Sequence, residues 1–137
     1  MRISRHVMKT LSENDIKIIY DKCVNLVKRK SYDFFNFKKM KKFEGSCNWT
    51  DIEIDPRGEV LSTALHECVH YIYPDYSETM VRYIEKRLIN VCSELDMAFF
   101  LKIISSKIYK SELQKVILKS KKNTKKGTKK SVTKCKK

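Results

Sequence analysis

His66-Glu67-Cys68-Val69-His70 has the spacing H-E-x-x-H and lies within a segment that has the pattern of an amphipathic helix. Residues 59–73 contain no Gly or Pro, and their apolar side chains recur at helical spacing. On such a helix His66 and His70 are one turn apart on the same face, where they can bind one metal ion. Glu67 lies beside the position of a metal-bound water, which is the arrangement of zinc hydrolases. The alternative interpretation is a surface helix that carries two solvated histidines.

The third ligand of such a site is expected shortly after this helix. Pro74 ends the helix, because it has no N–H to continue the hydrogen bonding and it restricts the residue before it. A second helix follows with Glu78 in its first turn, and an antiparallel arrangement would return Glu78 to the side of His70. Glu78 would then complete a His2Glu set with one position open for water. Two alternatives remain: Glu78 is an acid that the helix dipole favours, or Glu85 on the same face is the ligand.

Two further stretches flank the motif, Ile52-Glu53-Ile54-Asp55-Pro56-Arg57 before it and Tyr73-Pro74-Asp75-Tyr76-Ser77-Glu78 after it. Together with H-E-x-x-H they resemble the small zincin-like metallopeptidases of phages and large DNA viruses, over residues 52–89. The resemblance implies a zinc-dependent peptidase of the gluzincin type that hydrolyses a protein or peptide substrate. The site residues that it implies are three zinc ligands and one general base, namely His66, His70, Glu78 and Glu67.

Upstream of the motif, the sequence predicts an N-terminal helix and a small, mainly antiparallel sheet. Ser12 and Asp15 have the spacing of a capping box before an apolar helical stripe. Alternating residues predict strands over 33–43 and 51–55, with a return strand over 47–50 between them. The resemblance would place the strand 51–55 along the cleft, paired with an extended substrate. An ordinary sheet strand with a solvated acidic face is an equal alternative.

Downstream of the motif, helices are predicted from Glu78 onward and over 95–108 and 110–118, with their apolar residues packed on the sheet and the H-E-x-x-H helix. The fold class is therefore α+β, and the resemblance implies a minimal zincin-like domain of residues 1–118. The last predicted helix would contribute four residues to the core, namely Leu113, Val116, Ile117 and Leu118.

Peptide hydrolysis also needs a group that stabilises the oxyanion. Tyr71, Tyr73 and Tyr76 lie near the motif and are candidates for this role. Arg82, one turn after Glu78, either orients that carboxylate or forms an ordinary surface ion pair.

Residues 119–137 differ in composition from the rest of the chain. They contain ten lysines and no acid, and they supply +10 of the formal net charge of +14. Such a segment buries too little apolar surface to fold, so a disordered tail is expected, which would bind nucleic acid or a virion assembly. A nuclear address or a solubilising tail is the alternative. The candidate nucleic-acid contacts are six lysines, Lys121, Lys122, Lys125, Lys126, Lys129 and Lys130.

The sequence shows no apolar run typical of a signal peptide or a membrane span, and its five cysteines lack C-x-x-C pairing. These features predict a protein that is not secreted or inserted in a membrane, located in a reducing intracellular compartment, in the virion or in the host nucleus.

Two functions agree with the whole pattern. The first is a zinc peptidase with a nucleic-acid-associating tail. The second is a non-catalytic basic protein of a virion or of nucleic acid that retains a zincin scaffold.

Overall fold

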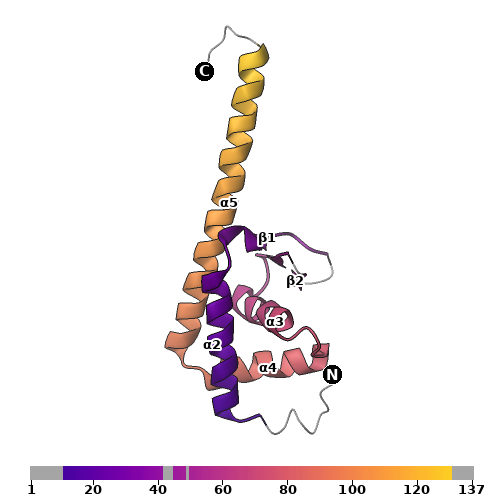
Figure 1. Cartoon of the computed structure of the whole chain (residues 1–137), viewed down its shortest axis with the longest axis vertical. Helices are drawn as coiled ribbons and strands as arrows, with labels where there is room; N and C mark the ends of the chain where they lie inside the picture. The colour runs from indigo at the N-terminus through magenta and orange to yellow at the C-terminus, as the bar shows by residue number, and fades with distance from the viewer. Residues whose placement is uncertain (1–10, 42–44, 49, 131–137) are drawn as a thin grey trace.

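The computed structural model of the chain describes residues 11–41, 45–48 and 50–130. Over these residues the fold is α+β, with four α-helices, one 3-10 helix and a three-stranded mixed sheet (Figure 1). The elements in chain order are α2 (Glu13–Arg29), η1 (Tyr32–Phe34), β1 (Phe35–Phe37), β2 (Gly45–Cys47), β3 (Ile52–Ile54), α3 (Val60–Ile72), α4 (Glu78–Val91) and α5 (Glu94–Lys130).

Helix α2 begins at the predicted capping box. The Ser12 hydroxyl accepts a hydrogen bond from the Asp15 N–H at 3.1 Å, and the Asp15 carboxylate accepts one from the Ser12 N–H at 3.0 Å. Two N–H groups at the start of the helix are therefore paired. At the other end of α2, the Lys107 ammonium of α5 donates to the carbonyl oxygens of Lys28 and Lys30. These bonds attach α5 to the end of α2.

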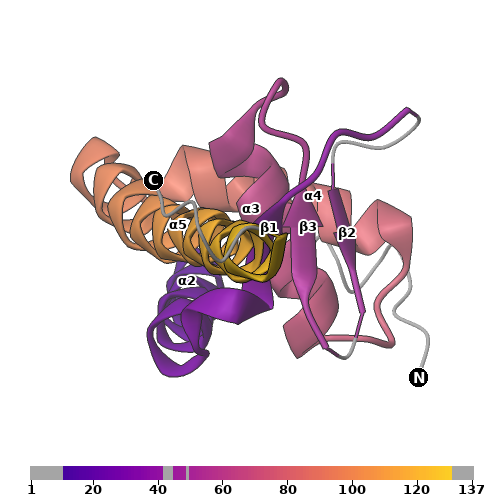
Figure 2. The ribbon, with the colours of Figure 1, turned by 90° about the horizontal axis from the view of Figure 1, so that it is seen from above.

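The sheet is mixed, not mainly antiparallel as the sequence predicts, and its strand order is β1-β3-β2 (Figure 2). β1 runs parallel to β3 with Phe35 opposite Ile52, and β2 runs antiparallel to β3 with Cys47 opposite the same residue. The strand predicted over 33–43 is shorter, because η1 forms its beginning and the chain leaves the strand after Phe37.

Asp55 determines where the chain goes after β1. Its buried carboxylate accepts hydrogen bonds from the Met40 N–H at 2.8 Å and from the backbone and side-chain N–H groups of Arg57. Arg57 also donates to the Met40 carbonyl oxygen at 2.9 Å. The bonds from Arg57 and Met40 hold the pKa of Asp55 well below its ordinary value. The segment after β1 is thereby tied to the end of β3, so it does not turn back beside β1 as an antiparallel partner.

Helix α3, which carries the H-E-x-x-H motif, packs against α2, α4 and α5 and against strands β2 and β3. Its core side is fully buried at Ala64, Leu65, Cys68 and Val69, as the helical spacing predicts. Burial raises the pKa of the Cys68 thiol well above its ordinary value, so this side chain packs as a small, neutral hydrophobic residue.

Helix α5 is one continuous helix from Glu94 to Lys130, whereas the sequence predicts two helices followed by a disordered tail. Residues 119–130 form the end of this helix, where the sequence predicts disorder. No Pro interrupts this segment, lysine is a good helix former, and the folded body supplies the helix nucleus that an isolated tail lacks. Residues 131–137 lie outside the described residues, and the assignment of 119–137 as a separate unit stays a prediction.

The apolar residues at the end of α5 do not join the core, contrary to the prediction. The last attachments of α5 to the sheet are at Ser111, which donates to the Asn36 side chain at 2.8 Å, and at Glu112, which accepts from the Phe37 N–H at 3.3 Å. Beyond them the helix extends past the body (Figure 1). The four residues predicted to be buried are exposed instead, namely Leu113, Val116, Ile117 and Leu118.

Across the described ranges, no helix has both the length and the apolar character needed to cross a lipid bilayer. Cys23, Cys47, Cys68 and Cys92 are present as free thiols. Burial raises the pKa of Cys23 to about 12, so this thiol stays protonated at neutral pH.

Candidate metal centre

The two histidines of the motif project from the side of α3 that faces away from the core. His66 and His70 are both half-buried, and their ring centroids lie 4.8 Å apart. The separation follows from the helix, because residues four apart lie one above the other on the same face. The predicted helical pair is therefore present, and it is not a pair of fully solvated side chains.

The turn at Pro74 brings the next helix back to this face. Helix α3 ends at Ile72, and α4 begins at Glu78 after Ser77, whose hydroxyl accepts a hydrogen bond from the Met80 N–H at 3.1 Å. Helices α3 and α4 then pack against each other. The sequence signal for this turn was Pro74, and α3 ends before it as predicted, while Ser77 provides the polar N-cap of α4.

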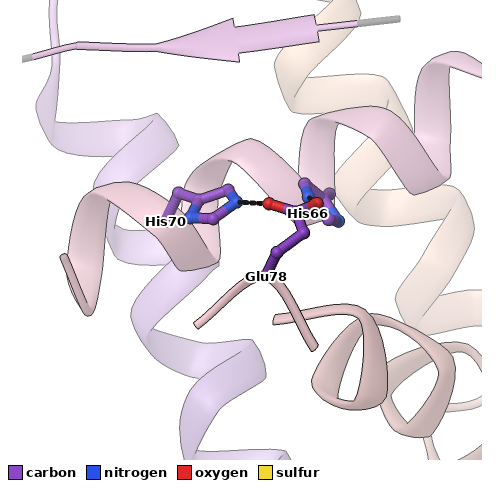
Figure 3. A group of neighbouring side chains, drawn as sticks. All are labelled: His66, His70 and Glu78. Atoms are coloured by element: carbon purple, nitrogen blue, oxygen red, sulfur yellow. Dashed lines mark hydrogen bonds and ion pairs between the residues drawn. The ribbon is translucent and has the colours of Figure 1, made fainter. Parts of the chain in front are cut away.

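Glu78 lies between the two imidazoles (Figure 3). One carboxylate oxygen is 2.8 Å from Nε2 of His70 and the other is 2.8 Å from Nε2 of His66. The three potential ligand atoms lie within 4.8 Å of one another. Partial burial alone would raise the pKa of Glu78, but the hydrogen bond with His70 and the charges of both imidazoles outweigh it and lower the pKa. The structure thus brings together the three residues that the sequence predicts as ligands.

Glu85, the alternative third ligand, contacts Nδ1 of His66, the ring nitrogen that does not face Glu78. Its carboxylate oxygen is 2.9 Å from Nδ1 of His66, whereas Nε2 of that ring faces Glu78. The hydrogen bond with Glu85 raises the pKa of His66, against the opposing effect of burial. Because a carboxylate accepts a hydrogen bond from the Nδ1–H group, it orients the ring and leaves Nε2 as the nitrogen with the free lone pair. Glu85 therefore supports a ligand here and does not itself join the group of three.

Glu67 is 7% exposed, and burial raises the pKa of its carboxyl to about 7. Its covering element is β2, whose Gly45 backbone lies directly on α3. A Cβ atom at Gly45 would be 2.6 Å from Cγ2 of Thr63 and 3.0 Å from Cγ of Glu67, so only glycine permits this approach. In the sequence, residues 44–46 are a turn candidate, whereas Gly45 belongs to β2; a glycine next to a predicted strand is a signal of close backbone contact.

A cleft of about 620 Å³ opens beside the centre, lined by residues of β2, α3 and α4 that include Cys47, Tyr71 and Arg82. A second hollow of about 460 Å³ continues on the other side and also contains Glu67 and Arg82. The strand that lines the cleft is β2, one of the two edge strands of the described sheet. The strand predicted over 51–55 is the central β3, whose two edges are already paired, so it is an ordinary sheet strand and does not border the cleft.

Only one of the three candidate tyrosines faces this cleft. Tyr71 lines it, whereas Tyr73 and Tyr76 stack on each other with ring centroids 4.6 Å apart and lie outside its lining. Arg82 lines both hollows, and its Nε is 3.4 Å from the Glu78 carboxylate. The guanidinium is largely exposed, so the ion pair itself adds little stability. Among the described residues that line the two hollows, Arg82 is the positively charged side chain that contacts the candidate ligand Glu78.

The six lysines proposed to contact nucleic acid all belong to the extension of α5. Lys121 is exposed on the helix. The other five lie within its last turns, and their side chains are outside the described structure. No feature of the described residues tests their role.

The chain matches no protein-family model, no characterised protein and no solved structure. The resemblance to zincin-like metallopeptidases therefore depends on the motifs alone. The grouping of His66, His70 and Glu78 in space is the observation on which a function can be proposed.

Proposed function

We propose that the protein is a zinc-dependent metallopeptidase of the gluzincin type, with His66, His70 and Glu78 as metal ligands. The observation that carries the proposal is the convergence of these three side chains from two helices, with their ligand atoms within 4.8 Å of one another. Two imidazole nitrogens and one carboxylate oxygen are a donor set that suits zinc and leaves one position open for water. The orienting contact of Glu85 with His66 is a further feature of such sites.

What zinc supplies when bound is Lewis acidity, which polarises a carbonyl group and lowers the pKa of water. Glu67 acts as the general base: its carboxylate takes a proton from the attacking water and then passes it to the nitrogen of the leaving amine. A new C–O bond forms and the C–N bond of the peptide breaks. The position of Glu67 supports this role, because its side chain follows His66 on α3 and lines the cleft together with the three ligand residues.

Two other features of the cleft support a peptide as the substrate. β2 has an unpaired edge in the described sheet, and an extended peptide can add to such an edge through backbone hydrogen bonds. Arg82 lies beside Glu78 at the junction of the two hollows, where its positive charge would stabilise an oxyanion. In this proposal Arg82 takes the role for which the three tyrosines were candidates.

A second candidate function rests on a separate observation. The end of α5 is rich in lysine and contains no acid after Glu112, which suits a non-catalytic protein that binds nucleic acid and retains the helical scaffold for shape. The peptidase is the better supported function, because a purely structural role does not require a buried carboxyl group, Glu67, next to the two histidines.

The deciding experiment measures zinc content and peptidase activity of the purified protein and of the Glu67→Gln variant. We expect one zinc per chain in both proteins, and a loss of at least about 100-fold in kcat for the variant, because the ligands remain and the base does not. The His70→Ala variant is the control that should lose the zinc. An active Glu67→Gln protein would exclude Glu67 as the base. A zinc-loaded parent that cleaves no member of a broad peptide library would favour the scaffold function.

A further inference from the structure

The outer face of α5 carries a group of exposed apolar side chains, which we call the α5 apolar face. Its members are Tyr109, Leu113, Val116 and Ile117, which are 69%, 42%, 63% and 36% exposed. They follow the spacing i, i+4, i+7 and i+8, so they share one side of the helix. The buried residues of the same helix, such as Ile104 and Ile108, lie on the opposite side.

The α5 apolar face lies where the helix separates from the body (Figure 1). Its attachments to the sheet end at Ser111 and Glu112. Leu118 lies on the same side of α5 as the buried Ile104 and Ile108, but beyond the body, and it is 62% exposed as well. Apolar residues gathered on one exposed helical segment are unusual in a soluble domain and mark an interaction surface.

The charges around this face restrict what can cover it. From residue 113 to residue 130 the chain has eight lysines and no acid. The nearest acid, Glu112, is already paired with Lys115 at 2.9 Å and with the Phe37 N–H. A second copy of the chain would bring two lysine-rich helices together, which is electrostatically unfavourable. The occupant must therefore combine an apolar surface with negative charge.

We propose that the α5 apolar face binds an acidic protein partner as a helix in a groove, with carboxylates of the partner beside the flanking lysines. The spacing of its four residues is that of the anchor positions of such helices. Duplex nucleic acid would pair with the lysines but would leave the apolar residues uncovered. An anionic membrane would engage a longer apolar face, and here Lys102, Ser105 and Ser106 interrupt the stripe before Tyr109. This surface is independent of the metal centre.

The test uses the full chain and a designed probe, a synthetic amphipathic helix with leucine at heptad positions a and d and glutamate at the flanking positions. We expect the acidic probe to bind, and a probe with lysine in place of glutamate to show no binding. Val116→Asp should weaken binding of the acidic probe at least tenfold, because it places a charge in the apolar contact. The control Ser105→Asp has the same charge change at an exposed site outside the face and should alter binding less than twofold. Circular dichroism checks that both variants stay helical.

Four results would overturn the proposal. The first is no binding of the acidic probe, and the second is equal binding by Val116→Asp and the parent, which would reduce the interaction to charge alone. The third is a parent protein that dimerises through this face, seen by sedimentation as a dimer that Val116→Asp disrupts. The fourth is binding to phosphatidylserine vesicles that Val116→Asp abolishes while the probe remains unbound, which would identify a membrane surface.

Discussion

Glu78 is the residue on which the candidate centre depends most, because its two carboxylate oxygens each contact one imidazole. Glu85 contacts only Nδ1 of His66, on the far side of the ring. The two acids lie on the same helix two turns apart, so the sequence alone left both open as ligands. Their different partners favour Glu78 as the candidate ligand and Glu85 as a residue that would orient His66.

We expect Glu78→Gln to weaken zinc binding by about tenfold or more, because a neutral amide is a poor replacement for a carboxylate ligand. Glu85→Gln should change the affinity only a few-fold, because its amide oxygen still accepts a hydrogen bond from Nδ1 of His66. Glu85→Leu, which removes the acceptor, should cost about tenfold. Competition with a chromophoric chelator measures all three. A larger loss for Glu85→Gln than for Glu78→Gln would mean that the ligand assignment is wrong.

Arg82 is the second residue whose role the proposed peptidase defines. Arg82→Ala should lower kcat by about 100-fold, the usual effect of losing one oxyanion-stabilising group, and should leave KM and zinc affinity within a few-fold. Lys86→Ala removes a cation one turn further along α4 and is the matched control. If Arg82→Ala loses zinc and activity together, Arg82 acts only by orienting Glu78.

At the level of elements, the position of β2 decides what the cleft can bind. Among the described strands β2 is at the edge of the sheet and lies over Glu67, whereas β3, which the resemblance favoured as the cleft strand, is paired on both sides. This order depends on Asp55, which ties the chain after β1 to the end of β3 through Met40 and Arg57. An acidic residue outside the site therefore helps to place the wall of the cleft.

The hydrogen bonds to Asp55 make the stability of the fold depend on pH. Its pKa is lowered in the folded protein by Arg57 and Met40, so the stabilisation is complete above the ordinary pKa of 3.8 and is lost as the pH falls below it. Asp55→Asn should therefore lower the melting temperature at pH 7, and its difference from the parent should shrink below about pH 4. Thermal denaturation across pH 2 to 7 measures this. A difference that stays constant with pH, or an equal effect of Asp21→Asn on the exposed side of α2, would contradict it.

At the level of the whole molecule, α5 joins two regions of different character. Its first half is part of the core, through buried residues such as Phe100 and Ile104. Its second half extends away from the body and carries eight lysines with no acid after Glu112. The candidate metal centre lies on α3 and α4, so the partner that we propose for the extension would not touch the cleft.

We expect deletion of residues 119–137 to leave zinc content unchanged and to reduce binding to DNA or RNA at low salt. The affinity of the intact chain for duplex DNA should fall as salt rises, by roughly 0.9 log units per log unit of salt for each phosphate neutralised. Lysines make point-charge contacts, so one duplex sequence should bind about as well as another. Fluorescence anisotropy at several salt concentrations measures both effects. An unchanged affinity in the truncated protein would assign the tail to nuclear import or to an acidic protein.

The sequence by itself determined the features that depend on residues close together in the chain. The spacing of His66 and His70 sets their common face, Pro74 sets the end of α3, and the Ser12 capping box sets the start of α2. Each follows from backbone geometry over a few residues, so a pattern in the chain is enough to predict it. The membership of Glu78 in the candidate centre is an extension of the same reasoning, because the turn between α3 and α4 is short.

Only the tertiary structure decided the features that depend on contacts between distant residues. In the folded chain Asp55 meets Met40, 15 positions away, and α5 separates from the body after the contact of Ser111 with Asn36, 75 positions away. Glu85 and Gly45 likewise acquire their roles only when α4 and β2 meet α3. Helical periodicity shows which side of α5 is apolar, but it does not show how far the body extends to cover that side. The exposure of Val116 is therefore a property of the packed molecule, because burial depends on which other elements reach a residue.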